Sequence, residues 1–197
     1  MLFNSLHFLV FFPFVALLIF LAPKKGKLPI LFGASCYFYM AFVPKLILIL
    51  FLLILIDFGA GIWIEQVSKS KKKAVLVASL FANLSVLFAF KYFNFLNENL
   101  GYLANALHLS YTPSVLKIIL PLGLSFHTFQ SMAYTIEVYW GRQKAEKNLL
   151  VYAIYVLFFP QLVAGPIERP QHLLHQLHRT IRFDARNAVL GMQLMVW

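Results

Sequence analysis

The stretch 159–170 concentrates residues that could form a binding or catalytic site. It reads Phe-Pro-Gln-Leu-Val-Ala-Gly-Pro-Ile-Glu-Arg-Pro and interrupts an apolar part of the sequence. Its prolines and glycine break helical hydrogen bonding and free backbone groups, and polar side chains lie beside the break. The residues concerned are Pro160, Gln161, Gly165, Pro166, Glu168 and Arg169. A loop that merely ends a helix would have a similar composition, but we favour a site.

His127 and Gln130 form a second polar group, on a helix predicted over 115–139. With Ser125, Thr128 and Ser131 they give an otherwise apolar helix a polar face, which implies a partner helix or a cavity. A single histidine in such a position is more often a satisfied interior residue than a catalyst. No Ser-His-Asp or Cys-His arrangement can be assembled from the sequence, so neither residue receives a catalytic role.

Asp57 is an acidic residue inside the apolar run 46–64. Acidic residues in such segments are rare and usually face the interior of a helix bundle or a cavity. A structural hydrogen bond to a neighbouring helix explains Asp57, and the close approach that Gly59 and Gly61 allow would favour it. A place on a solute or substrate path is the alternative, and we favour the structural explanation.

His172, His175 and His178 recur every third residue and spread over an arc of a helix. A zinc site needs a different histidine spacing and further ligands, so contact of this basic face with lipid headgroups or cofactor phosphates is a simpler explanation. The single cysteine, Cys36, can form neither an intrachain disulfide nor a zinc cage. We therefore predict no metal site and no bound cofactor.

The composition excludes an ordinary soluble domain. Of the 197 residues 61% are hydrophobic and 12% are charged, whereas soluble domains average about 45–50% apolar and 25% charged residues. The long apolar runs predict an all-α, multi-span transmembrane protein in a lipid bilayer. The net charge of +10 fits the Lys and Arg that membrane proteins collect in cytoplasmic loops, so we expect no nucleic-acid partner.

Five segments are apolar enough to cross a membrane. They are 2–22, 28–43, 46–64, 74–90 and 115–139. The main clusters of Lys and Arg follow the first, third and fifth segments, so alternation places all of them on one side of the membrane. That side is predicted to be the cytoplasm, which puts the N-terminus outside.

The segment 149–167 is short and broken by prolines, and the arginines after it belong with the cytoplasmic clusters. We therefore predict that it enters the membrane and returns, which requires burial of its irregular backbone. The stretches 92–107 and 171–182 each carry leucines on one face and polar residues on the other, as expected of interfacial amphipathic helices. Residues 187–197 read as the start of a further helix with Asp184 as its N-cap, so the chain is expected to be the N-terminal part of a longer protein.

Four blocks of sequence resemble the membrane-bound O-acyltransferase family, in the same order. The blocks are Ile56-Asp57-Phe58 with Gly61, then 90–95, then 120–130 running on to 139, and 159–170. The resemblance is closest to the bacterial cell-envelope branch, which includes the alginate O-acetyltransferase and teichoic-acid D-alanyl transferase membrane proteins. It covers most of the chain from Asp57 onward, and the last two blocks are the specific ones.

The resemblance implies an enzyme of the bacterial cytoplasmic (inner) membrane. Such an enzyme moves an acyl group of acetyl or D-alanyl type from a cytoplasmic thioester, acyl-CoA or an acyl-carrier protein, through a membrane tunnel. The acceptor is a hydroxyl of an exported polysaccharide or teichoic acid, and an extracytoplasmic acyltransferase is a further partner. The family's catalytic histidine acts as a general base. It lies in the later half of the family, and none of the six histidines here matches it.

The polar residues identified first thereby become candidates for the tunnel wall. They are His127, Gln130, Pro160, Gln161, Gly165, Pro166, Glu168 and Arg169. One alternative is a non-enzymatic transport or scaffold protein, in which Asp57 and the broken segment would line a solute path. Transporters usually show two related halves, and the sequence has no such symmetry. The other alternative is an inactive, truncated product.

Overall fold

The computed structural model describes residues 5–41, 44, 47–107, 123–161, 168–179 and 183–196. All regular structure in these residues is helical, which confirms the all-α prediction. The helices are α1 (Leu6–Leu21), α2 (Lys24–Met40), α3 (Ile47–Gln66), α4 (Lys69–Ala106), α5 (Leu124–Tyr139), α6 (Leu149–Leu157), the 3₁₀ turn η2 (Phe159–Gln161), α7 (Pro170–His178) and α8 (Ala185–Val196).

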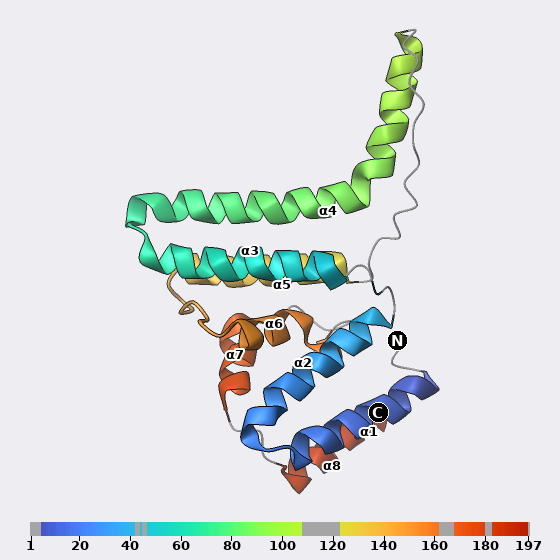
Figure 1. The fold of residues 1–197 in the computed structure, drawn as a ribbon, viewed down its shortest axis with the longest axis vertical. Helices are drawn as coiled ribbons and strands as arrows, with labels where there is room; N and C mark the ends of the chain where they lie inside the picture. Colours follow the sequence, from blue (N-terminus) through green and yellow to red (C-terminus); the bar gives the residue numbers. More distant parts are fainter. Residues whose placement is uncertain are drawn as a thin grey trace.

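The helices are stacked in layers (Figure 1). The first part of α4 forms the outermost layer, and α3 and α5 lie together beneath it. The next layer holds α6 and α2, with α7 beside α6, and α1 packs on the far side of α2. A single core of apolar side chains runs through these layers.

The short helix α6 is the most completely enclosed element of the fold. Every residue from Val151 to Leu157 is buried, as expected of a helix that is apolar on all sides. Its first turn is capped by Asn148, whose side-chain oxygen accepts hydrogen bonds from the backbone N–H groups of Leu150 and Val151. The helix ends before Pro160, which lies in η2.

Two of the described helical segments are long and apolar enough to cross a membrane. They are Ile47–Gln66, which is α3, and the Lys69–Phe93 part of α4. Leu6–Leu21 and Leu149–Gln161 are apolar but shorter. Many large apolar side chains on the outer faces of α3 and α4, such as Leu52 and Phe81, are exposed, and extended apolar surface of this kind needs lipid or a partner to cover it. The count of five spans and the re-entrant path of 149–167 remain predictions.

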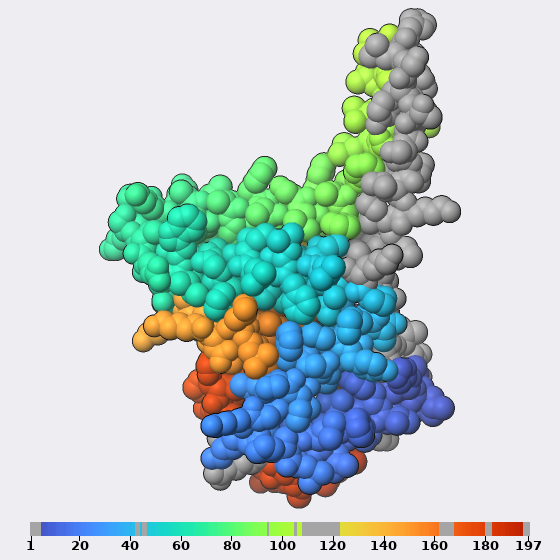
Figure 2. Space-filling view, in the orientation of Figure 1, coloured from blue at the N-terminus to red at the C-terminus, as the bar shows by residue number. Residues whose placement is uncertain are grey.

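Helix α4 differs from the sequence prediction. A span over 74–90 and a separate interfacial helix over 92–107 were expected, but a single helix continues from Lys69 to Ala106. No proline or glycine occurs between Lys69 and Leu100, so no residue type that breaks helical hydrogen bonding separates the two parts. The helix bends, and its C-terminal part projects beyond the body formed by the other helices (Figures 1 and 2).

The other predicted segments are described only in part. Residues 108–122, at the beginning of the predicted span 115–139, and residues 162–167, at the end of 149–167, lie outside the described residues. In the stretch 171–182, α7 buries its leucines and exposes His172, His175 and His178, which is the predicted amphipathic arrangement. Asp184 caps α8 through a 2.9 Å hydrogen bond from the backbone N–H of Arg186, as predicted.

The three basic connections lie at one end of the helix stack. In Figure 1 the turn between α3 and α4 and the connection between α5 and α6 lie at the left, and the turn between α1 and α2 lies at the lower, left-hand ends of those two helices. These turns hold or adjoin the lysine and arginine clusters of the sequence. The arrangement agrees with a single basic face, whose position on the cytoplasmic side of a membrane remains a prediction.

Helices α3 and α5 approach closely at Gly61. A Cβ atom on Gly61 would lie 2.7 Å from the hydroxyl oxygen of Tyr134 and 2.8 Å from its Cε1 atom. The Tyr134 ring is fully buried, and its hydroxyl accepts a hydrogen bond from the backbone N–H of Glu146 at 2.9 Å. Gly59, by contrast, has space around it. The close approach expected from the two glycines is therefore made by Gly61.

We expect Gly61→Ala to lower the free energy of unfolding by about 1–3 kcal/mol, because the added methyl group overpacks a buried contact. Gly59→Ala is the matched control, and the better helix propensity of alanine should leave it neutral or raise stability by up to about 1 kcal/mol. Thermal unfolding of the purified chain in detergent would measure both effects. Equal Tm values for the two variants would contradict the close packing at Gly61.

Candidate functional site

Asp57 is the centre of a buried polar cluster between α3, α4 and α5. Its side chain is fully buried. From α4, the amide of Asn83 donates a 2.8 Å hydrogen bond to it and the hydroxyl of Ser79 donates another. From α5, the hydroxyl of Thr135 donates at 3.1 Å, and that of Ser131 also donates. A buried carboxylate without partners is costly, so these donors make the position of Asp57 tolerable and support the structural explanation of this residue.

The Asp57 cluster continues into the buried helix α6. The hydroxyl groups of Ser131 and Tyr152 are 2.9 Å apart. Because the Ser131 hydroxyl proton is donated to Asp57, the Tyr152 hydroxyl donates to Ser131. A chain of hydrogen bonds therefore connects α3, α5 and α6, all through side chains that are buried.

His127 and Gln130 cap the C-terminal end of α6. The His127 Nδ1 atom lies 2.7 Å from the carbonyl oxygen of Val156, and the Gln130 amide nitrogen lies 2.8 Å from the carbonyl oxygen of Tyr155. A carbonyl only accepts, so Nδ1 of His127 carries a proton. In a neutral imidazole this leaves Nε2 as a hydrogen-bond acceptor.

Pro160 explains why these carbonyls need side-chain partners. The last carbonyls of a helix have no intrahelical donor. In a continued helix the N–H of residue 160 would donate to the carbonyl of Val156, but proline has no N–H. His127 supplies the missing donor. The polar face of α5 and the break after α6, which the sequence suggested as two separate features, therefore meet at one place.

The third contact at this place involves Tyr155 and the start of α7. The Tyr155 hydroxyl oxygen lies 3.3 Å from the carbonyl oxygen of Gln130 and 3.2 Å from the carbonyl oxygen of Glu168. Tyr155 thus ties the backbone just before α7 to α5 and α6. We name the group of His127, Gln130, Tyr155, Val156 and Glu168 the α6-end cluster.

Several buried polar atoms near the α6-end cluster have no hydrogen-bond partner among the residues that the structure describes. These are His127 Nε2, Gln130 Oε1, Gln161 Oε1 and the Tyr39 hydroxyl. The Tyr39 ring packs edge-on against His127, with 6.0 Å between ring centroids. Buried polar groups are normally satisfied, so these atoms could hold water or a ligand group that carries an O–H or N–H. The described part of the chain has no group of histidine, cysteine or acidic residues suited to a metal ion.

The other residues selected from the sequence take different positions. Pro160 is exposed and Gln161 is partly buried. Arg169 is exposed immediately before α7, and the Glu168 carboxylate lies 3.1 Å from the exposed His172. Gly165 and Pro166 lie outside the described residues. The structure thus brings His127, Gln130 and the backbone of Glu168 together but places Asp57 in the neighbouring cluster.

Sequence reasoning missed five side chains of these clusters: Ser79, Asn83, Thr135, Tyr152 and Tyr155. The first two occupy adjacent turns of α4, and Thr135 lies one turn beyond Ser131. Polar residues four positions apart share one helix face, so this spacing inside apolar helices was the signal available. Tyr155 had no such signal, because its neighbours in α6 are almost all apolar.

We expect Asp57→Ala to lower the free energy of unfolding by about 3 kcal/mol, because several buried donors lose their acceptor. Asp57→Asn keeps the shape and one acceptor oxygen and should cost less. Asp184→Ala, which removes only an exposed helix cap, should cost about 1 kcal/mol. Thermal unfolding in detergent compares the three variants. An Asp57→Ala variant as stable as Asp184→Ala would show that the Asp57 cluster does not join the helices.

The sequence is similar to those of several known proteins. The chain is 33% identical to the probable alginate O-acetylase AlgI of Pseudomonas aeruginosa, over 93% of this chain and 36% of that protein. It is also 33% identical to the protein of that name from Azotobacter vinelandii, over 93% of this chain and 38% of the relative. The peptidoglycan O-acetyltransferase of Helicobacter pylori is 29% identical, over 98% of this chain and 42% of the relative.

No family model matches the chain, and no solved structure matches it either. The chain spans a little more than a third of the length of the first curated relatives that it matches. Within that length the likeness extends over nearly all of the present sequence. The likeness confirms that this chain resembles the membrane-bound O-acyltransferase family, and it extends over part of the length of such proteins.

Proposed function

We propose that this chain contributes to an enzyme that transfers an acetyl group to a hydroxyl of a cell-envelope polysaccharide. The observation that carries the proposal is the likeness over 93% of the chain to two probable alginate O-acetylases. The likeness to a peptidoglycan O-acetyltransferase agrees with it. Because all of these names specify acetyl transfer, acetyl is a better supported group than D-alanyl.

The donor in this proposal is a thioester on the cytoplasmic side, either acyl-CoA or an acyl-carrier protein. The acceptor oxygen attacks the thioester carbonyl, a general base takes the hydroxyl proton, and the thiol leaves. A histidine suits that base, and we assign it to a part of the enzyme that the present chain does not supply. An extracytoplasmic acyltransferase is the proposed further partner.

In this proposal the α6-end cluster forms part of the wall of an acyl tunnel. Irregular backbone at membrane depth is tolerated only where it is buried in protein or lines a wet cavity. The last residues of α6, Val156 and Leu157, are buried, the regular helix ends there, and His127 and Gln130 bind the carbonyls of Val156 and Tyr155. Their remaining acceptor atoms, His127 Nε2 and Gln130 Oε1, are buried and have no partner within the described part of the chain, and they would accept hydrogen bonds from a substrate hydroxyl or a water molecule.

The proposed location is the bacterial inner membrane, with the N-terminus outside and the basic connections in the cytoplasm. Two segments long enough to span support membrane insertion. The position of the basic connections at one end of the stack supports the orientation (Figure 1), because cytoplasmic loops are enriched in Lys and Arg.

Deleting the gene should lower the ester content of the envelope polysaccharide, and a plasmid copy should restore it. Ester released by mild alkali from purified polymer, measured as acetate, tests the proposal directly. Unchanged acetate content in the deletion strain would argue for the transport or scaffold alternative. If the wild-type polymer released D-alanine instead of acetate, the transferred group would be D-alanyl and the acetyl assignment would be wrong.

Gln161→Ala and Arg169→Ala should each reduce polymer acetylation in the complemented strain by about tenfold, the effect of losing one substrate-positioning hydrogen bond. The matched controls are Gln193→Ala and Arg186→Ala, which change exposed residues of α8. Immunoblotting of membranes must show equal protein levels. Lower acetylation that merely follows a lower protein level would assign Gln161 and Arg169 a structural role.

A further inference from the structure

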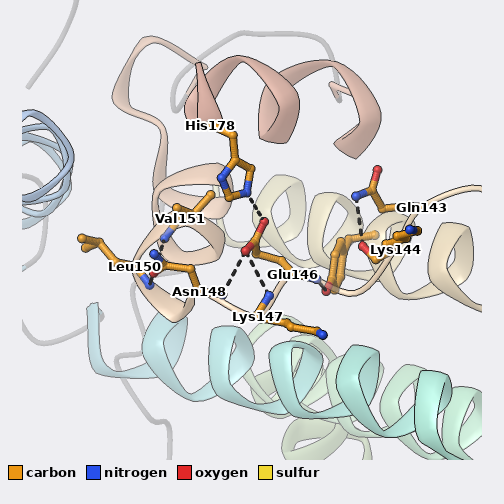
Figure 3. Close-up of polar contacts among 9 residues, drawn as sticks. Gln143, Lys144, Glu146, Lys147, Asn148, Leu150, Val151 and His178 are labelled. Atoms are coloured by element: carbon orange, nitrogen blue, oxygen red, sulfur yellow. Dashed lines mark hydrogen bonds and ion pairs between the residues drawn. The ribbon is translucent and has the colours of Figure 1, made fainter. Parts of the chain in front are cut away.

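A polar pocket opens where the connection between α5 and α6 meets α7 (Figure 3). Its volume is about 380 Å³, and its walls include Lys144, Glu146, Lys147, Gln171, His175 and His178. Two other surface hollows among the described residues are lined mainly by apolar residues, one between α3 and α4 and one between α1 and α2. Apolar hollows of that kind suit lipid chains, whereas this pocket suits a polar ligand.

The one carboxylate in the pocket wall is already engaged by the protein. Glu146 Oε1 accepts hydrogen bonds from the backbone N–H groups of Lys147 and Asn148, at 3.0 and 2.9 Å. Glu146 Oε2 lies 2.6 Å from His178 Nε2 (Figure 3). Because Glu146 is also buried, both of its carboxylate oxygens are held by donors of the protein rather than by the lysines.

The basic groups of the pocket are available to a ligand. Lys144, Lys147 and His175 are exposed, and within the described ranges their side chains have no hydrogen bond or ion pair. Two ammonium groups on one concave surface raise the local concentration of anions. The connection between α5 and α6, which supplies Lys144 and Lys147 to the pocket, lies toward the same side of the stack as the basic turn between α3 and α4 (Figure 1), so long-range attraction acts in the same direction.

Gln171 indicates which hydrogen-bonding group the ligand should carry. Its amide nitrogen donates a 2.8 Å hydrogen bond to Glu137, which fixes the orientation of the side chain. Its Oε1 atom is buried and has no partner among the described residues. An acceptor held in this way next to basic groups fits a ligand that combines an anionic group with a hydroxyl or an N–H group.

We propose that this pocket binds the phosphate group of an organic phosphate ester. Lys144 and Lys147 contact the phosphate oxygens, and Gln171 accepts from a hydroxyl or amide of the same ligand. Two sources share this chemistry: the phosphate-bearing end of a coenzyme A thioester, and the headgroup of an anionic phospholipid. Only the first source rests on the proposed function, in which the donor approaches from this basic side.

The test uses the purified full chain and measures binding rather than transfer. Calorimetry in a neutral detergent determines the affinity for coenzyme A, with inorganic phosphate as competitor. Nanodiscs of phosphatidylcholine with and without phosphatidylglycerol determine the retention of the anionic lipid. Lys144→Ala/Lys147→Ala should weaken binding of one of these probes by about tenfold, because two charge-assisted contacts are lost. Raising the salt concentration should weaken wild-type binding as well.

Lys71→Ala/Lys73→Ala is the matched control, because it removes the same charge from exposed positions at the start of α4. It should leave the affinity within about twofold of wild type, as expected of distant, screened charges. Coenzyme A binding that inorganic phosphate displaces identifies the nucleotide source, and selective loss of phosphatidylglycerol identifies the lipid source. Absence of binding of both probes, or equal losses in the two double variants, overturns the proposal.

The outcome is independent of the test of the proposed function. If deletion of the gene leaves polymer acetylation unchanged while the pocket binds phosphate, the acetyltransferase proposal fails and the pocket remains. If acetylation is lost on deletion and neither probe depends on Lys144 and Lys147, the pocket proposal fails alone.

Discussion

The burial of a single carboxylate, that of Asp57, is the interaction on which the arrangement of the helices depends. A carboxylate inside an apolar helix stack needs several donors, and no one neighbouring helix provides them all. Ser79 and Asn83 come from α4, and Ser131 and Thr135 come from α5. Satisfying Asp57 therefore sets how α4 and α5 slide and rotate against α3. Gly61 permits the close contact of α5 that this requires.

The position of α5 in turn decides how α6 ends. His127 and Gln130 lie on the same helix as Ser131, one turn or less before it, so a helix held by Asp57 presents them to the carbonyls of α6. Pro160 makes the His127 donor necessary, because it cannot supply the N–H that a continued helix would offer to the carbonyl of Val156. A short, fully buried helix with an irregular end is therefore stable only in this setting.

The two proposals concern different places and different chemistry. In the α6-end cluster His127, Gln130 and Tyr155 are buried, and acceptor atoms of the first two have no partner among the described residues, which suits a hydroxyl within an enclosed tunnel. The pocket beside α7 is open and lined by lysines and histidines, and the carboxylate in its wall is already hydrogen-bonded to the protein, which suits a phosphate arriving from the aqueous side. Tyr155 and α7 connect them, because Tyr155 contacts the backbone of Glu168 immediately before α7. Helix α7 thus contributes residues to the pocket and, through the backbone just before it, also contacts the end of α6.

The amino-acid sequence by itself determined the properties that depend on near neighbours in the chain. It predicted an all-α fold, the capping of α8 by Asp184, the amphipathic face of α7, the break around Pro160 and an interior place for Asp57. These follow from helical periodicity and backbone chemistry, which act over a few residues. Only the tertiary structure decided which groups meet: Ser79 and Ser131 at Asp57, His127 at Val156, and His178 at Glu146. The continuity of α4 through 92–106 was also decided only by the structure, because the amphipathic pattern of this stretch suits either a separate helix or a continued one. Partners 20 to 80 residues apart depend on the register in which whole helices pack, which the local pattern of residues does not specify.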